Sequence, residues 1–139
     1  MFLRMQDQFQ WRADLLLSGR LEDLASEFLF PCVFYIGQDM RMLQTAAQFV
    51  HVMGNFRYWR LVNGTRQHLA QVISVEVPRN RRFRVWVDFR DFAEDGRELR
   101  MMGTLHYCRQ TDSGVQTEMV ESWMCSADEF AEVPISRIT

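Results

Sequence analysis

The sequence predicts an α+β fold in which three N-terminal helices pack on a strongly curved antiparallel β-sheet. Two patterns in the 139-residue chain predict it. Apolar residues recur at three- and four-residue steps through roughly the first 60 positions, and from Gln67 onward they alternate with polar residues. With 47% hydrophobic and 24% charged residues, the chain matches one compact domain spanning residues 1–139.

Helical spacing predicts the first two helices. One covers about residues 2–17, and Ser18 and Gly19 end it. Its apolar face consists of Phe2, Met5, Phe9, Ala13, Leu16 and Leu17. A shorter helix starts at Leu21 and ends before Pro31.

A strand and a longer helix follow. Residues 32–36 are aromatic and β-branched and precede a glycine, which is typical of a strand. Asp39 is a suitable N-cap for the next helix, whose apolar stripe spans residues 43–53. We expect this third helix to end near Gly54 or Trp59.

Four further strands are predicted from the period-two pattern. They cover residues 72–77, 83–89, 98–110 and 115–125. Short connections rich in Pro, Asn, Asp, Ser and Gly separate them, so successive strands are expected to pair antiparallel. Phe83, Val85, Val87 and Phe89 are expected to face the helices.

Charge and cysteine content exclude several function classes. A net charge of -2 argues against non-specific nucleic-acid binding. No apolar run approaches the roughly 20 residues that cross a bilayer, and the first residues carry charges where a signal peptide is apolar, so we expect a cytoplasmic protein without a membrane partner. Cys32, Cys108 and Cys125 have neither disulfide-framework nor zinc-ligand spacing, so no metal is expected.

The order helix, helix, strand, long helix and hairpin-linked strands is combined with the segment RFRVWV at residues 82–87, which leads into a turn at Asp95 and Gly96. This arrangement resembles the superfamily of nuclear transport factor 2, ketosteroid isomerase and the SnoaL-like polyketide cyclases. The resemblance implies a cone-shaped fold with a deep pocket between the long helix and the concave sheet face. It also implies that the opposite sheet face makes a dimer.

The pocket residues depend on the register of the last hairpins. If Asp95-Gly96 is a two-residue turn, Thr104 and His106 face inward. The same rule at the next turn places Glu121 opposite His106 and Trp123 opposite Thr104. These side chains then converge on a mostly apolar wall, which is typical of a small-molecule pocket.

A three-residue loop with Gly96 in a left-handed bulge is equally ordinary, and it reverses the faces. His106 then lies outside, beside Trp86 and Asp88. Hydrophobicity favours this register, whereas the resemblance favours the first, which we adopt: His106 falls where ketosteroid isomerases place a buried acid, and Trp123 where they place a pocket aromatic.

Other isomerase positions do not match. The tyrosine donor of those enzymes corresponds to about Arg12, and their carboxylate base to about Ile36. The reaction of the ketosteroid isomerases is therefore not expected.

The candidate catalytic pair is His106 with Glu121, because a carboxylate can orient an imidazole that titrates near neutral pH. The alternative is a cross-strand pair that only satisfies polar groups. The candidate ligand contacts are Trp123, Thr104, Tyr35, Tyr58 and His51. No function is assigned to His68.

The sequence therefore predicts a pocket protein for a small hydrophobic molecule, with a lyase, isomerase or cyclase that needs no cofactor as its enzymatic form. Two alternatives stay open: a non-catalytic ligand-binding protein, and a structural small subunit like those of ring-hydroxylating dioxygenases. A homodimer is expected through the outer sheet face. That face would display Arg84, Trp86, Asp88, Leu105, Tyr107 and Val120.

Overall fold

The computed structural model describes residues 1–125 and 127–130. The helices are α1 (Phe2–Ser18), α2 (Leu21–Ala25) and α3 (Ala46–Val62), with a short 3₁₀ helix η1 (Ala127–Phe130). The strands are β1 (Phe28–Ile36), β2 (Asp39–Leu43), β3 (Gln67–Val75), β4 (Arg82–Phe92), β5 (Glu98–Thr111) and β6 (Gly114–Trp123). No helix in this part of the chain is long and apolar enough to span a membrane.

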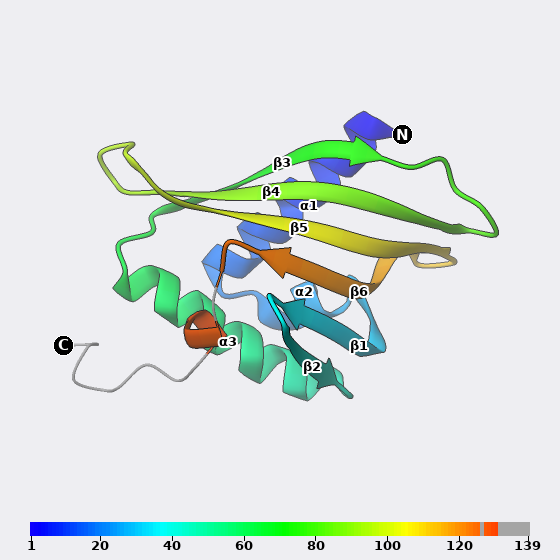
Figure 1. Cartoon of the computed structure of the whole chain (residues 1–139), viewed down its shortest axis with the longest axis horizontal. Helices are drawn as coiled ribbons and strands as arrows, with labels where there is room; N and C mark the ends of the chain where they lie inside the picture. Colours follow the sequence, from blue (N-terminus) through cyan, green and yellow to red (C-terminus); the bar gives the residue numbers. More distant parts are fainter. Residues whose placement is uncertain (126, 131–139) are drawn as a thin grey trace.

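The strands form one curved sheet in the order β2-β1-β6-β5-β4-β3, and helices lie against one of its faces (Figure 1). The α+β fold is therefore as predicted. The long strands β3 to β6 pair antiparallel, as expected, but β1 and β6 run parallel, so the sheet is mixed.

Helix α1 closely matches its predicted span. Its buried positions recur with helical period, and Gly19 ends it in the left-handed conformation (φ 80°) that glycine adopts without strain. Two glutamines of α1 bind the exposed edge of β3: the Gln6 amide donates to Ala70 O, and Gln10 Oε1 accepts from Ala70 N. These bonds hold the helix across the edge strand and satisfy backbone groups that would otherwise be unpaired.

The segment between α2 and α3 differs from prediction. Helix α2 ends at Ala25, and residues from Phe28 onward already belong to β1. Asp39 does not cap a helix but starts strand β2, which forms a tight hairpin with β1. Thr45 is the N-cap of α3, since its side chain accepts a hydrogen bond from Gln48 N at 3.2 Å.

The β4–β5 hairpin has the predicted register, with Val87 opposite Thr104 and Val85 opposite His106. The loop is nevertheless the three-residue one: Ala93 N bonds to Arg97 O, and Gly96 has φ 86°. Asp91 pairs with Arg100 and Phe92 with Glu98, so Leu99 is an extra residue in β5. This bulge places the residues of β5 on the faces that the two-residue turn predicted. The loop prediction was wrong, and the prediction of facing residues is confirmed.

The β5–β6 hairpin does not have the predicted register. Its two-residue turn lies one position earlier than expected, because Thr111 pairs with Gly114, and a bulge at Glu118 follows. His106 consequently lies opposite Val120, and Glu121 lies opposite Leu105. A shift of one residue exchanges the faces of a strand, so Val120 points inward and Glu121 outward.

The core lies between the helices and the concave face of the sheet. Phe83, Val85, Val87 and Phe89 are all buried there, as predicted. Phe9 from α1 and Phe49 from α3 belong to the same hydrophobic core and are fully buried. Asp91 continues the inward-facing positions of β4, which places a carboxylate at one end of an otherwise apolar row.

Candidate functional site

A cavity of about 80 Å³ lies between the helices and the inner face of the sheet. Its apolar wall consists of Ala13, Leu16, Leu24, Phe28, Phe34, Met53, Phe56, Phe89, Met102, Val120 and Phe130. Its polar residues are Arg12, His68, Thr104, His106 and Ser122. A mostly apolar wall with a few converging polar groups is the usual composition of a small-molecule site.

His106 is held by one hydrogen bond inside this cavity. Its Nε2 lies 3.0 Å from Thr104 Oγ1, and the Thr104 hydroxyl donates to Val87 O at 2.7 Å. Because the threonine proton is used on the carbonyl, His106 Nε2 must donate and Nδ1 must carry the lone pair. Within the described residues, the buried Nδ1 has no hydrogen-bond partner.

Burial and the charge of Arg12, which lines the same cavity, keep His106 neutral. The guanidinium donates to Thr117 Oγ1 at 2.6 Å and to Glu27 Oε1 at 3.2 Å, and it lies 4.6 Å from the Phe9 ring centre. Burial, reinforced by the positive charge of Arg12, lowers the pKa of His106 well below its ordinary value. His106 is therefore a neutral hydrogen-bond acceptor at physiological pH.

His68, on β3, reaches the same cavity but has a carboxylate partner. Its Nδ1 lies 2.6 Å from Asp91 Oδ1, directly across the β3–β4 ladder. The His68 ring stacks on Phe89 at 5.2 Å, and Phe89 also contacts His106 edge-on at 6.2 Å. Burial lowers the pKa of His68 more than the hydrogen bond to Asp91 raises it, so the imidazole is neutral at rest.

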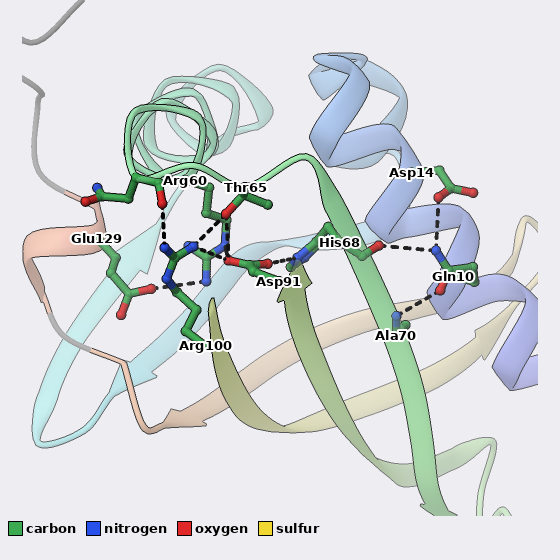
Figure 2. A network of polar contacts seen from close by, with 10 residues as sticks. Gln10, Asp14, Arg60, Thr65, His68, Ala70, Asp91, Arg100 and Glu129 are labelled. Atoms are coloured by element: carbon green, nitrogen blue, oxygen red, sulfur yellow. Dashed lines mark hydrogen bonds and ion pairs between the residues drawn. The ribbon is translucent and has the colours of Figure 1, made fainter. Parts of the chain in front are cut away.

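The second oxygen of Asp91 is held by cations and a hydroxyl (Figure 2). Oδ2 accepts from Arg100 Nη1 at 2.8 Å and from Thr65 Oγ1 at 3.2 Å, and Arg60 Nε lies 3.2 Å away. Burial raises the pKa of Asp91, but the His68 hydrogen bond and the Arg60 charge outweigh it and lower the pKa to about 2. Asp91 is thus ionised, and His68 Nδ1 must donate to it.

Arg60 connects this cluster to the C-terminal helix η1. Its Nη2 lies 3.1 Å from Glu129 Oε1, and its guanidinium stacks 3.5 Å from the Phe56 ring centre. Phe130 packs on Phe56 at 4.6 Å and forms part of the cavity wall. The ion pair therefore anchors η1 where it covers the cavity.

The structure brings only two of the predicted site residues together, Thr104 and His106. Glu121 lies on the outer face and accepts from the Tyr107 hydroxyl at 2.9 Å, so the predicted His106–Glu121 pair does not form. Trp123 also lies outside, 41% exposed, with its indole so close over Gly103 that a Cβ there would collide. The one-residue shift in β6 causes both errors.

Three other predicted contacts do not line this cavity. Tyr35 belongs to a shallow outer hollow with Glu121 and Trp123. His51 lies in a surface groove between β2 and α3, and Tyr58 is exposed on α3. Ligand contact by these three residues would need a second site, and none of them reaches His106.

Sequence reasoning assigned no role to His68 or Asp91. The sequence pattern of β4 places Asp91 on the buried face, because it continues the inward alternation of Phe83, Val85, Val87 and Phe89. His68 likewise alternates with Ala70 and Val72. Among the residues that the structure describes, no three His, Cys, Asp or Glu side chains are placed to hold a metal ion.

Known structures share this fold. A domain with a cystatin-like fold from Nostoc punctiforme matches with a TM-score of 0.69 and 16% identity, covering 89% of this chain and 76% of that one. A nuclear transport factor 2-like protein from Novosphingobium aromaticivorans gives 0.65 and 13%, covering 88% and 82%. A ketosteroid isomerase-like protein from Erwinia carotovora atroseptica gives 0.57 and 9%, covering 80% and 85%.

The chain therefore has the nuclear transport factor 2-like fold, which confirms the predicted resemblance at the level of architecture. No protein-family model matches the sequence, and no curated protein matches it. At these identities the likeness establishes the fold and leaves the activity to the site, because this fold carries many functions.

Proposed function

We propose that this protein binds a compact, mostly apolar molecule that carries one hydrogen-bond donor, such as a hydroxyl group. The observation that carries the proposal is the Nδ1 of His106, which lies in an apolar cavity and has no hydrogen-bond partner in the part of the chain that the structure describes. A buried acceptor without a partner costs about 1–3 kcal/mol, and a ligand donor would relieve that cost. The apolar wall would contribute affinity, and His106 would select the donor.

Phenol and toluene test this proposal, because they have similar shapes and differ in the donor. We expect phenol to stabilise the protein more than toluene in thermal unfolding, with an affinity about 2- to 10-fold higher, as one neutral hydrogen bond contributes about 0.5–1.5 kcal/mol. Equal affinities, or no stabilisation by either compound, would contradict the proposal.

His106→Gln is the matched variant. The glutamine amide nitrogen takes the place of Nε2 and can still donate to Thr104, while the acceptor at Nδ1 is lost. The variant should bind toluene as the wild type does and lose the preference for phenol. Retention of the preference would show that another group recognises the donor.

The sequence also predicted catalysis by His106, and the structure supports a different role for it. Among the described residues, a protonated His106 would have no carboxylate beside it and would face the charge of Arg12. This environment favours binding over proton transfer at His106. A lyase, isomerase or cyclase activity in this cavity would need another base.

We also propose that the outer sheet face binds a second copy of this chain. Arg84, Trp86 and Tyr107 lie there, with the Arg84 guanidinium 5.1 Å from the Trp86 ring. Val120, which we had placed on this face, is buried in the cavity wall instead. Light scattering should show a dimer that Trp86→Arg weakens, and a wild-type monomer at micromolar concentration would refute it.

A further inference from the structure

We infer that His68 is a general base in the cavity, that Asp91 positions it, and that His106 only accepts a hydrogen bond. This inference rests on the proposed function, because it assigns chemistry to a molecule bound in that site. It replaces the predicted His106–Glu121 pair with a pair formed across β3 and β4.

The two imidazoles are held in opposite tautomers. His68 donates through Nδ1 to an ionised carboxylate, which leaves the lone pair on Nε2. His106 donates through Nε2 to Thr104, which leaves the lone pair on Nδ1. Both rings line the cavity. Within the described residues, the buried Nδ1 of His106 has no hydrogen-bond partner, and the hydrogen bond of the His68 ring is the one from Nδ1 to Asp91. A bound molecule therefore meets two acceptors.

Only His68 is built to keep a proton that it accepts. A proton on Nε2 creates an imidazolium whose Nδ1–H already bonds to Asp91, so an ion pair forms without any movement. The same proton on His106 would create a buried cation near Arg12, and no carboxylate of residues 1–125 or 127–130 contacts this ring. His68 therefore accepts the proton, and His106 orients the bound molecule.

The surrounding charges support this assignment. Facing the His68–Asp91 pair are Arg60 from α3 and Arg100 from β5, and Asp14 of α1 acts on His68 from the other side. Glu129 of η1 neutralises Arg60 in turn. The two arginines hold Asp91 as a carboxylate, while Asp14 favours the imidazolium.

The proposed step is a proton transfer. An acidic C–H or O–H bond of the bound molecule breaks, its proton moves to His68 Nε2, and the electron pair stays on the molecule or expels a leaving group. The imidazolium then returns the proton to the molecule or to water. The substrate class is compact, mostly apolar compounds whose acidic hydrogen lies next to an electron-withdrawing group.

The probe for this step is 5-nitrobenzisoxazole, a compact aromatic compound. A base removes its ring C–H, the N–O bond breaks, and the coloured product 2-cyano-4-nitrophenolate forms without any co-reactant. We expect saturable turnover whose kcat rises as the pH rises and then levels off once His68 is neutral. Turnover no faster than that of free imidazole, with toluene still bound, would overturn the inference and leave the proposed function standing.

Two matched variants identify the base. In His68→Asn the amide nitrogen takes the place of Nδ1 and still donates to Asp91, but the base at Nε2 is gone, so kcat should fall about 100-fold or more. His106→Gln removes a binding group but keeps the proposed base, so its kcat–pH profile should retain the wild-type midpoint. Glu121→Gln, outside the cavity, is the control that should leave kcat unchanged. The opposite pattern for the two histidine variants would make His106 the base and overturn the inference. If the wild type neither turns over the probe nor binds toluene, the result would contradict the proposed function as well.

Asp91→Asn tests the positioning role. The asparagine can still accept the Nδ1–H bond, but the imidazolium loses its counter-charge, so the midpoint of the kcat–pH profile should move down. Arg100→Met removes a cation from Asp91 Oδ2 and should move the midpoint up, and it covers the case in which Asp91→Asn does not fold. A purely structural role would change stability without moving either midpoint.

Discussion

The surroundings of His68 and His106 differ although both residues line the same cavity. His68 belongs to a charged cluster of Asp91, Arg60 and Arg100. His106 contacts two aromatic rings and one threonine, and the charge that acts on it is the positive one of Arg12. Burial makes both imidazoles neutral. The difference lies in the neighbouring charge: Asp91 opposes the effect of burial on the pKa of His68, whereas Arg12 adds to the effect of burial on the pKa of His106.

The largest expected effect comes from removing the carboxylate of the charged region. Asp91→Ala would leave Arg60 buried with one partner fewer and His68 Nδ1 unbonded, which should lower the free energy of unfolding by about 3–5 kcal/mol. Urea unfolding measures it. The control is Glu98→Ala, which breaks an exposed pair with Arg90 and should cost at most about 1 kcal/mol. Similar losses for both would refute the cluster's importance.

Phe89 contacts both histidines, so its removal should affect both regions. Phe89→Ala deletes a buried ring that contacts His68 and His106, and we expect a loss of about 3–5 kcal/mol. Arg90→Ala, the next residue on the outer face, is the control and should cost about 1 kcal/mol or less. Equal melting temperatures for the two variants would mean that Phe89 does not pack as described.

Replacing each histidine by leucine compares the regions directly. His68→Leu leaves Asp91 Oδ1 without its donor and should cost about 1–3 kcal/mol. His106→Leu removes a buried acceptor that has no partner among the described residues, which stabilises, but it also removes the hydrogen bond from Nε2 to Thr104, which destabilises. The two effects oppose each other and Thr104 keeps its bond to Val87, so stability should change by less than about 1 kcal/mol. Chemical denaturation of both variants checks this order, and the reverse order would contradict it.

Stability should fall in acid because both histidines are neutral in the fold. The folded pKa of each lies below the ordinary 6.5, so below pH 6.5 the unfolded chain binds protons that the fold does not. The contribution is complete above that pH and is lost as the pH falls, by at most about 1.4 kcal/mol per unit and histidine. Asp91 adds a loss of the same sign only between its ordinary pKa of 3.8 and about 2.

Urea titrations between about pH 7 and 5 measure this slope. His106→Gln and His68→Asn should each reduce it by about one proton, and a slope unchanged in either variant would show that the missing histidine is not neutral in the fold.

The smallest effects are expected for residues that the sequence suggested and the structure places outside the cavity. Glu121→Gln and Tyr58→Phe should leave phenol affinity unchanged and stability within about 0.5 kcal/mol. Thermal shift with phenol measures both quantities. Weaker phenol binding in either variant would place the ligand elsewhere on the molecule.

The sequence determined the elements whose periodic pattern is long. Helix α1 and the inward face of β4 follow directly from spacing, because one buried face fixes which positions must be apolar. The segment from Asp39 to Leu43 was too short for its period to distinguish a strand from a helix. Its pairing with β1 decided the outcome.

The tertiary structure alone decided which residues meet in the cavity. Three single-residue bulges, at Ile73 in β3, Leu99 in β5 and Glu118 in β6, each exchange the two faces of a strand. The bulge in β5 compensated a loop of unexpected length and left His106 inside, while the one in β6 moved Glu121 outside. Bulges serve the curvature of the whole sheet, so no local pattern specifies their positions, and the pairing of His68 with Asp91 appears only once the strands are aligned.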